Sequence, residues 1–141
     1  MRKAILTMII FAVVLTSCMA ASEEKMERMI YVKGNNGTVV FELNSSKAAD
    51  DLWKQLPIET EVGNFGNNEK IFYPEKGLDT SGAPLAEGGE GTLAYYRPWG
   101  NVVMFYGSFS PNASLYGLGR AVEGAELISS LSGAVTLVKA E

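Results

Sequence analysis

The chain of 141 residues contains no histidine, a single cysteine (Cys18) and a single glutamine (Gln55). Without histidine there can be no histidine general base and no serine–histidine–aspartate triad. With only one cysteine as well, nearly every kind of zinc site is excluded. We therefore expect no metal site and no cofactor, and no motif in the chain is specific to one chemistry.

Basic residues are fewer than acidic ones. The chain has 12 lysines and arginines and 16 aspartates and glutamates, which gives a net charge of −4. Removal of an N-terminal leader that carries Arg2 and Lys3 would leave ten cations against the same 16 acids, a net charge of −6. Such a surface repels phosphates, so nucleic acid is not an expected partner. The length and the hydrophobic share of 47% suit one folded domain.

The apolar run Ala4–Val14 follows the basic start Met1-Arg2-Lys3 and is too short to span a bilayer comfortably. This layout predicts a secretory signal peptide over residues 1–17. The next residues, Leu15-Thr16-Ser17-Cys18, resemble the lipobox of bacterial lipoproteins. The resemblance implies cleavage before Cys18 and lipidation of that cysteine on its sulfur and its new amino group. The alternative is an ordinary secretory signal with an incidental cysteine.

A lipidated Cys18 implies that the protein is held in the bacterial cell envelope by two or three acyl chains, which anchor a protein stably. Met19 replaces the aspartate that usually retains lipoproteins in the inner membrane, so the outer membrane is favoured, with the domain facing the periplasm. Residues 18–28 are then the lipidated cysteine and a polar tether. Residues 29–141 form the domain.

Short β-rich runs separated by turn residues dominate the domain. The Asn-Gly pair at 36–37 is a strong hairpin signal, and two segments have helical spacing of apolar residues. The pattern favours a barrel or a sandwich, and two helices could close the ends of a barrel. The predicted strands cover 29–33, 38–43, 58–65, 70–73, 93–96, 101–106, 114–122 and 133–139, and the predicted helices cover 47–56 and 124–131.

The segment 91–107 contains two of these strands, joined by a tight turn at Arg97-Pro98-Trp99-Gly100, and is rich in aromatic residues. We expect this hairpin to form one wall of a cleft where Arg97 and the rings hold a carboxylate or a peptide. Neighbouring strand residues point to opposite faces, so Tyr95 and Tyr96 cannot both line it. The alternative is a plain hairpin turn with a surface arginine.

Three further features leave alternatives open. The irregular stretch 75–90 is long enough to be a functional loop. In the glycine-interrupted strand 114–122, strict alternation places Leu118 and Arg120 on one face together with Tyr116 and Val122, whereas a bulged strand would simply expose Arg120. Glu69, beside Lys70, is either a buried acid or half of a surface ion pair.

Several motifs together resemble the bacterial cyclophilin-like fold family over nearly all of residues 29–141. The resemblance implies an eight-stranded barrel of the cyclophilin type, capped by helices. True cyclophilins are prolyl isomerases, but this chain lacks their histidine, their Gln-Gly-Gly run and their Phe-x-Arg motif. We therefore carry over the fold and not the activity. The motifs are Leu56-Pro57, Asn68–Ile71, Leu78–Pro84, Tyr95–Asn101, Phe105-Tyr106 and Leu118–Arg120.

The fold class expected is thus mainly β, a closed cyclophilin-like barrel of about eight strands with two short helices. The expected function is non-catalytic binding of a small molecule or a peptide by a membrane-anchored lipoprotein, with the 75–90 loop as the rim of the cleft. The alternatives are a divergent prolyl isomerase that uses an arginine hydrogen bond, and an envelope scaffold protein. The predicted binding residues are Tyr73, Tyr96, Arg97, Trp99, Phe105 and Arg120.

Overall fold

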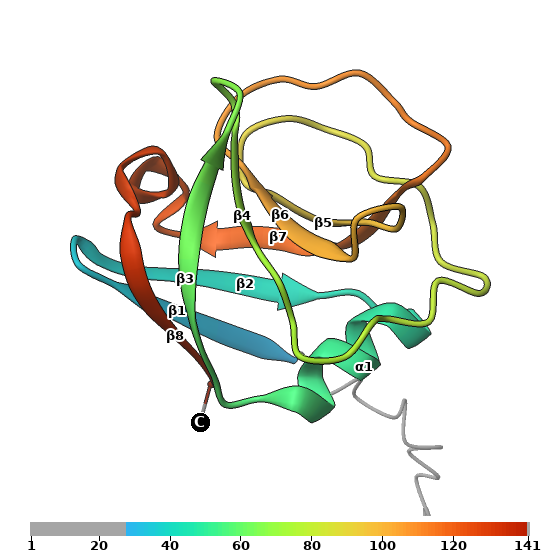
Figure 1. Cartoon of the computed structure of the whole chain (residues 1–141), viewed down its shortest axis with the longest axis horizontal. Coiled ribbons are helices and arrows are strands. Elements are labelled where there is room, and N and C mark those ends of the chain that lie inside the picture. Colours follow the sequence, from blue (N-terminus) through green and yellow to red (C-terminus); the bar gives the residue numbers. More distant parts are fainter. Residues whose placement is uncertain (1–27, 141) are drawn as a thin grey trace, which may run out of the picture.

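The computed structural model describes residues 28–140. The predicted signal peptide, Cys18 and the tether as far as residue 27 lie outside the described residues. Eight strands form a closed, fully antiparallel barrel in the order β1-β2-β7-β5-β6-β4-β3-β8 (Figure 1). The expected fold class is confirmed. The strands are β1 (Met29–Gly34), β2 (Gly37–Leu43), β3 (Ile58–Phe65), β4 (Glu69–Phe72), β5 (Thr92–Tyr96), β6 (Asn101–Phe105), β7 (Leu115–Glu123) and β8 (Gly133–Lys139).

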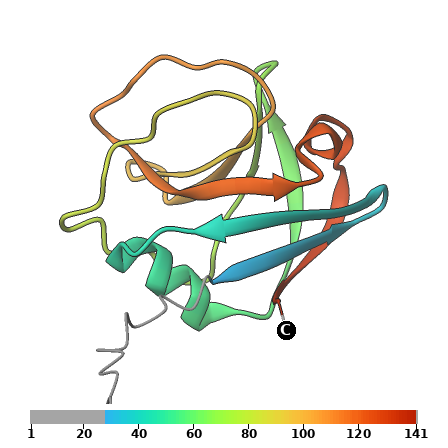
Figure 2. The ribbon, with the colours of Figure 1, turned by 180° about the vertical axis from the view of Figure 1, so that it is seen from behind.

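Two helices lie at opposite ends of β2. The first is α1 (Lys47–Gln55), which follows the C-terminal end of β2 (Figures 1 and 2). The hydroxyl of Ser46 caps α1 by accepting a hydrogen bond from the Ala49 backbone N–H at 3.1 Å. The other helix is the 3₁₀ helix η1 (Ala125–Ser130), which packs against β2 and β4. Both helices contribute fully buried side chains to the barrel core. No helix within residues 28–140 combines the length and the apolar character needed to cross a membrane.

Strand β7 departs from the predicted alternation. Leu93 on β5 pairs with Gly119 but its neighbour Ala94 pairs with Gly117, so Leu118 is an extra residue in the ladder. Leu118 is therefore buried in the barrel core while Arg120 is exposed. The prediction that Leu118 and Arg120 share one face was wrong, and the alternative of a bulged strand with an exposed arginine is correct.

The buried apolar residues form two separate clusters rather than one. The larger cluster fills the barrel interior and includes Phe41, Phe72 and Leu118. The smaller one lies on the outer face of the sheet formed by β4, β6, β5 and β7, and Phe105 and Leu115 belong to it. Two loops, 106–114 and 84–91, arch together beyond this outer face in both views (Figures 1 and 2). The candidate site lies on this outer face, next to the smaller apolar cluster.

Candidate functional site

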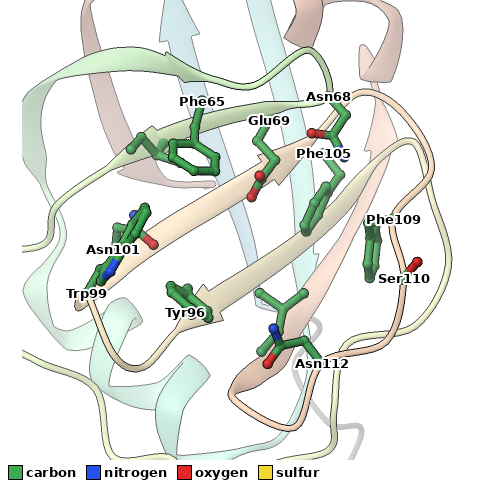
Figure 3. A pocket seen from close by; sticks show the side chains of 12 residues that line it. Phe65, Asn68, Glu69, Tyr96, Trp99, Asn101, Phe105, Phe109, Ser110 and Asn112 are labelled. Atoms are coloured by element: carbon green, nitrogen blue, oxygen red, sulfur yellow. The ribbon is translucent and has the colours of Figure 1, made fainter.

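A row of three side chains crosses the outer face of the barrel from β3 through β4 to β6. Phe65 is paired with Glu69, and Glu69 is paired with Phe105. Directly opposite residues on adjacent antiparallel strands project on the same side with Cβ atoms about 5 Å apart. Figure 3 shows the Glu69 carboxylate between the two phenyl rings, directed into the cavity. The strand register therefore places one acid between two aromatic rings.

The turn between β5 and β6 brings a third and a fourth ring to this face. The backbone N–H groups of Trp99 and Gly100 both donate to the Tyr96 carbonyl, at 3.3 and 3.0 Å. Gly100 has φ of 68°, a left-handed value that favours glycine at the end of the turn. The Trp99 ring meets Tyr96 and Phe65 edge to face, with centroids 5.4 and 5.1 Å apart. Trp99 stays 51% exposed and stands at the mouth of the cavity.

The loop 106–114 forms the opposite wall. Phe109 stacks on Phe105 with ring centroids 3.9 Å apart. The Asn68 side chain donates to the Ser108 carbonyl at 3.0 Å, which ties the loop to the turn that precedes β4. The Asn112 side-chain oxygen accepts from the Ser114 backbone N–H at 2.8 Å. These bonds fix the loop so that Phe109 faces the cavity (Figure 3).

Together these elements line a cavity of about 260 Å³ on the outside of the barrel, and the cavity is open to solvent (Figure 3). Five of the twelve lining residues are aromatic and five carry other polar side chains, and small-molecule sites likewise combine apolar walls with placed polar groups. The lining residues are Phe65, Asn68, Glu69, Ile71, Tyr96, Trp99, Asn101, Phe105, Phe109, Ser110, Asn112 and Leu115.

Asn101 is the most deeply buried polar residue of this lining, with 2% of its surface exposed. Its position is fixed by pairing with Tyr96 at the start of β6. Its side-chain oxygen is buried and has no hydrogen-bond partner. A buried acceptor without a partner costs about 1–3 kcal/mol, and such a group in a native fold calls for an explanation. A ligand that donates a hydrogen bond here would supply the missing partner.

Glu69 is the acid of the cavity, and partial burial raises the pKa of its carboxyl above the ordinary value. Desolvation is the one cause of the shift, and none of the ion pairs within residues 28–140 involves Glu69. Lys70 projects to the other face of β4, where its ammonium lies 5.8 Å from the centre of the Tyr106 ring. Of the two alternatives for Glu69, the structure therefore supports the partly buried acid.

The structure brings together three of the six predicted binding residues, since Tyr96, Trp99 and Phe105 all line the cavity. The other three, Tyr73, Arg97 and Arg120, do not line it and are exposed. Arg97 lies in the turn with Trp99, but its side chain is not part of the wall. The expected grouping of an arginine with the rings is therefore not found in this cavity. Tyr95 and Tyr96 do separate as predicted, because Tyr95 is buried in the barrel core.

Sequence reasoning missed Phe65, Asn101 and Phe109, and it noted Glu69 without placing it in the cleft. Part of the signal was present, because strict alternation along 101–105 puts Asn101 on the same face as Phe105. The remaining signal is long-range. Only the pairing of β4 with β3 and β6 places Glu69 between two phenylalanines. Within residues 28–140, no three acidic, cysteine or histidine side chains are grouped closely enough to hold a metal ion.

The fold and the cavity define a small closed barrel with a pocket on its outer face. The chain matches the model of the cyclophilin-like family over residues 32–139, and it belongs to this family. Among solved structures it is similar to the solution structure of a hypothetical protein from Archaeoglobus fulgidus, with a TM-score of 0.63 and 19% identity. That match covers 84% of this chain and 99% of the archaeal one, and it shows the fold alone. A comparison with curated proteins found no match.

Proposed function

We propose that this chain is a membrane-anchored bacterial lipoprotein whose cyclophilin-like domain binds a small molecule or a peptide in the outer-face cavity. The observation that carries the binding proposal is the buried Asn101 oxygen without a partner, inside a cavity walled by aromatic rings. The anchor is supported by the lipobox-like residues that end at Cys18.

Binding without catalysis is favoured over prolyl isomerisation. The isomerase hypothesis required an arginine to donate a hydrogen bond to the proline nitrogen. Arg97 and Arg120 both lie outside the cavity lining, and that lining contains no other arginine. We therefore expect no acceleration of cis–trans exchange in a proline tetrapeptide at micromolar protein. Clear acceleration that is lost in Arg97→Ala or Arg120→Ala would contradict this part of the proposal.

The cavity is tested by ligand screening with Trp99 as the reporter. Trp53 and Trp99 are the two tryptophans of the chain, so Trp53→Phe leaves fluorescence from Trp99 alone. A ligand of the cavity should raise the melting temperature and change the Trp99 emission. Trp99→Ala should weaken the binding of that ligand about tenfold, the usual effect of removing an aromatic residue that dominates a site. Thermal shift measures the effect in a protein that lacks the fluorophore.

Tyr73→Ala is the matched control. Tyr73 is another large aromatic residue with a similarly exposed side chain, 57% against 51% for Trp99, but it does not line the cavity. Its removal should leave binding unchanged. Equal losses in Trp99→Ala and Tyr73→Ala, or no loss in either, would show that ligands bind elsewhere.

A further inference from the structure

The charged groups of the cavity lining are of one sign, negative. Glu69 is its one acid, and it contains no lysine or arginine. The acid has no ion-pair partner within the described part of the chain, and Lys70 is directed to the opposite face of the strand. A partly buried carboxylate without a cation is unfavourable, because it has lost water and gained no opposite charge. The missing positive charge can come from a ligand.

The aromatic rings around Glu69 also favour a positively charged ligand. Phe65 and Phe105 flank the carboxylate, and Trp99 and Tyr96 continue the wall towards the mouth. The face of an aromatic ring carries partial negative charge and attracts cations, most strongly for tryptophan. The same faces give no stabilisation to an anion. Ring faces and an unpaired acid are the usual elements of sites that hold organic ammonium groups.

Two polar groups of the lining, Asn101 and Glu69, offer hydrogen-bond acceptors. The Asn101 side-chain oxygen is buried and unpaired, and the ionised Glu69 carboxylate can only accept. In contrast, Asn68 and Asn112 already use side-chain atoms in hydrogen bonds to the backbone of the 106–114 loop. A ligand that carries hydrogen-bond donors complements the acceptors of Asn101 and Glu69. A cavity of about 260 Å³ is slightly smaller than the usual range of about 300–1,000 Å³ for ligand pockets, so the bound group is small.

We infer that the cavity binds a small organic cation, a protonated amine with an apolar or aromatic body, whose ammonium group lies against Glu69 and the surrounding rings while a donor of the ligand reaches Asn101. This inference rests on the proposed binding function and names the class of its ligand. The inferred ligand carries a positive charge, whereas the cleft predicted from the sequence used Arg97 and the rings to hold a carboxylate or a peptide.

The test compares two probes that have nearly the same shape. Benzylamine is protonated at neutral pH, and benzyl alcohol is its uncharged counterpart with a hydroxyl donor. Both are titrated at neutral pH and constant ionic strength into the full-length protein, purified from membranes in detergent and carrying Trp53→Phe, with Trp99 emission as the readout. Benzylamine should bind about tenfold more tightly than benzyl alcohol, since hydrogen bonds to charged groups exceed neutral ones by about this factor.

Glu69→Gln removes the charge and keeps the shape of the side chain. It should lower benzylamine affinity about tenfold and leave benzyl alcohol affinity unchanged, so that the two probes bind equally. Glu59→Gln is the matched control, because Glu59 is exposed on β3 and does not line the cavity. This control removes the same amount of charge and should change neither affinity. An unchanged melting temperature in both variants shows that they fold.

A pH titration gives a second readout that a purely structural role of Glu69 would not produce. The residues facing Glu69 across β3 and β6 are Phe65 and Phe105, and the other titratable residue of the lining is Tyr96. Benzylamine affinity should fall as the pH decreases through the raised pKa of Glu69, whereas benzyl alcohol affinity stays constant. Glu69→Gln should abolish this dependence.

Three results would overturn the inference: benzyl alcohol binding as tightly as benzylamine, unchanged benzylamine affinity in Glu69→Gln, or no binding of benzylamine. Failure of the wider proposal looks different. If uncharged ligands from the screen bind through Trp99 while benzylamine does not, the cavity is a binding site and only the ammonium class is wrong. If Trp99→Ala leaves the binding of every ligand unchanged, the cavity itself is wrong.

Discussion

At the scale of single residues, Glu69 is the group whose environment differs most from what its local sequence suggests. Its neighbour Lys70 offers an ion pair in the sequence, yet strand geometry sends the two side chains to opposite faces of β4. The carboxyl is instead placed between Phe65 and Phe105, where burial raises its pKa. An acid kept in such a place at a cost to stability is typical of functional sites.

The raised pKa of Glu69 predicts how this residue affects stability as the pH changes. Because the folded protein holds the proton more tightly than the unfolded chain, protonation favours folding. The effect of Glu69 is most favourable below its ordinary pKa and is lost as the pH rises through the raised folded-state pKa. Glu69→Gln should therefore increase the free energy of unfolding relative to the wild type more at neutral pH than in acid.

Urea denaturation of the wild type and Glu69→Gln across this pH range measures the difference. The exposed Glu59→Gln serves as the control for losing one negative charge. A stability difference between wild type and Glu69→Gln that does not vary with pH would contradict the shifted pKa.

At the scale of elements, strand β7 shows how one glycine permits the barrel to close. Gly119 lies beside the bulge at Leu118, and a Cβ atom at this position would overlap the backbone carbonyl oxygen of Glu42 on β2. The close approach of β7 to β2 therefore requires a residue without a side chain. The bulge also separates the buried Leu118 from the exposed Arg120.

Gly119→Ala should destabilise the domain by about 1–3 kcal/mol, the usual cost of forcing extra atoms into a packed region. The matched control is Gly63→Ala on β3, where a Cβ atom would meet nothing within 4 Å and φ is not left-handed. That change should be neutral or slightly stabilising, since it mainly restricts the unfolded chain. Thermal and urea unfolding compare the two variants, and equal stabilities would argue against the close contact between β7 and β2.

At the scale of the whole molecule, the described chain enters and leaves the barrel at neighbouring points. The Ala140 N–H donates to the Met29 carbonyl at 2.9 Å, and Arg28 pairs with Asp50 on α1 at 2.8 Å. The entry point is thus tied to both β8 and α1. In the proposed lipoprotein, a tether that begins at Cys18 leads to this point, and the domain forms a closed unit beyond it.

Cys18→Ser tests the proposed anchor. In a Gram-negative host the wild-type protein should sediment with membranes, because two or three acyl chains hold a protein stably. It should also incorporate labelled palmitate. The variant cannot form the thioether, so it should incorporate no palmitate and should not appear as the cleaved, lipidated form. If both proteins are released as soluble, unlabelled chains, the leader is an ordinary secretory signal.

Much of the fold is encoded locally, and for that reason the sequence predicted it. Alternation of apolar residues in strands, the Asn-Gly turn and the helical spacing of apolar residues all act over a few residues. The strands and both helices were accordingly placed within a few residues of their observed bounds. The same local geometry placed Tyr96 and Tyr95 on opposite faces. The resemblance to the cyclophilin-like family added the number of strands and the closure of the barrel.

Register, by contrast, depends on contacts between segments far apart in the chain, and only the tertiary structure decided it. Closure of the barrel puts β7 between β2 and β5, and β4 between β3 and β6. These pairings bulge β7, separate the exposed Arg120 from the buried Leu118 and set Glu69 between Phe65 and Phe105. A shift of one residue in the pairing of two strands would move every side chain of one strand to the other face of the sheet. No local pattern specifies which residues of neighbouring strands are paired. The sequence thus determined the strands and the aromatic hairpin, while tertiary packing determined the charge and the walls of the cavity.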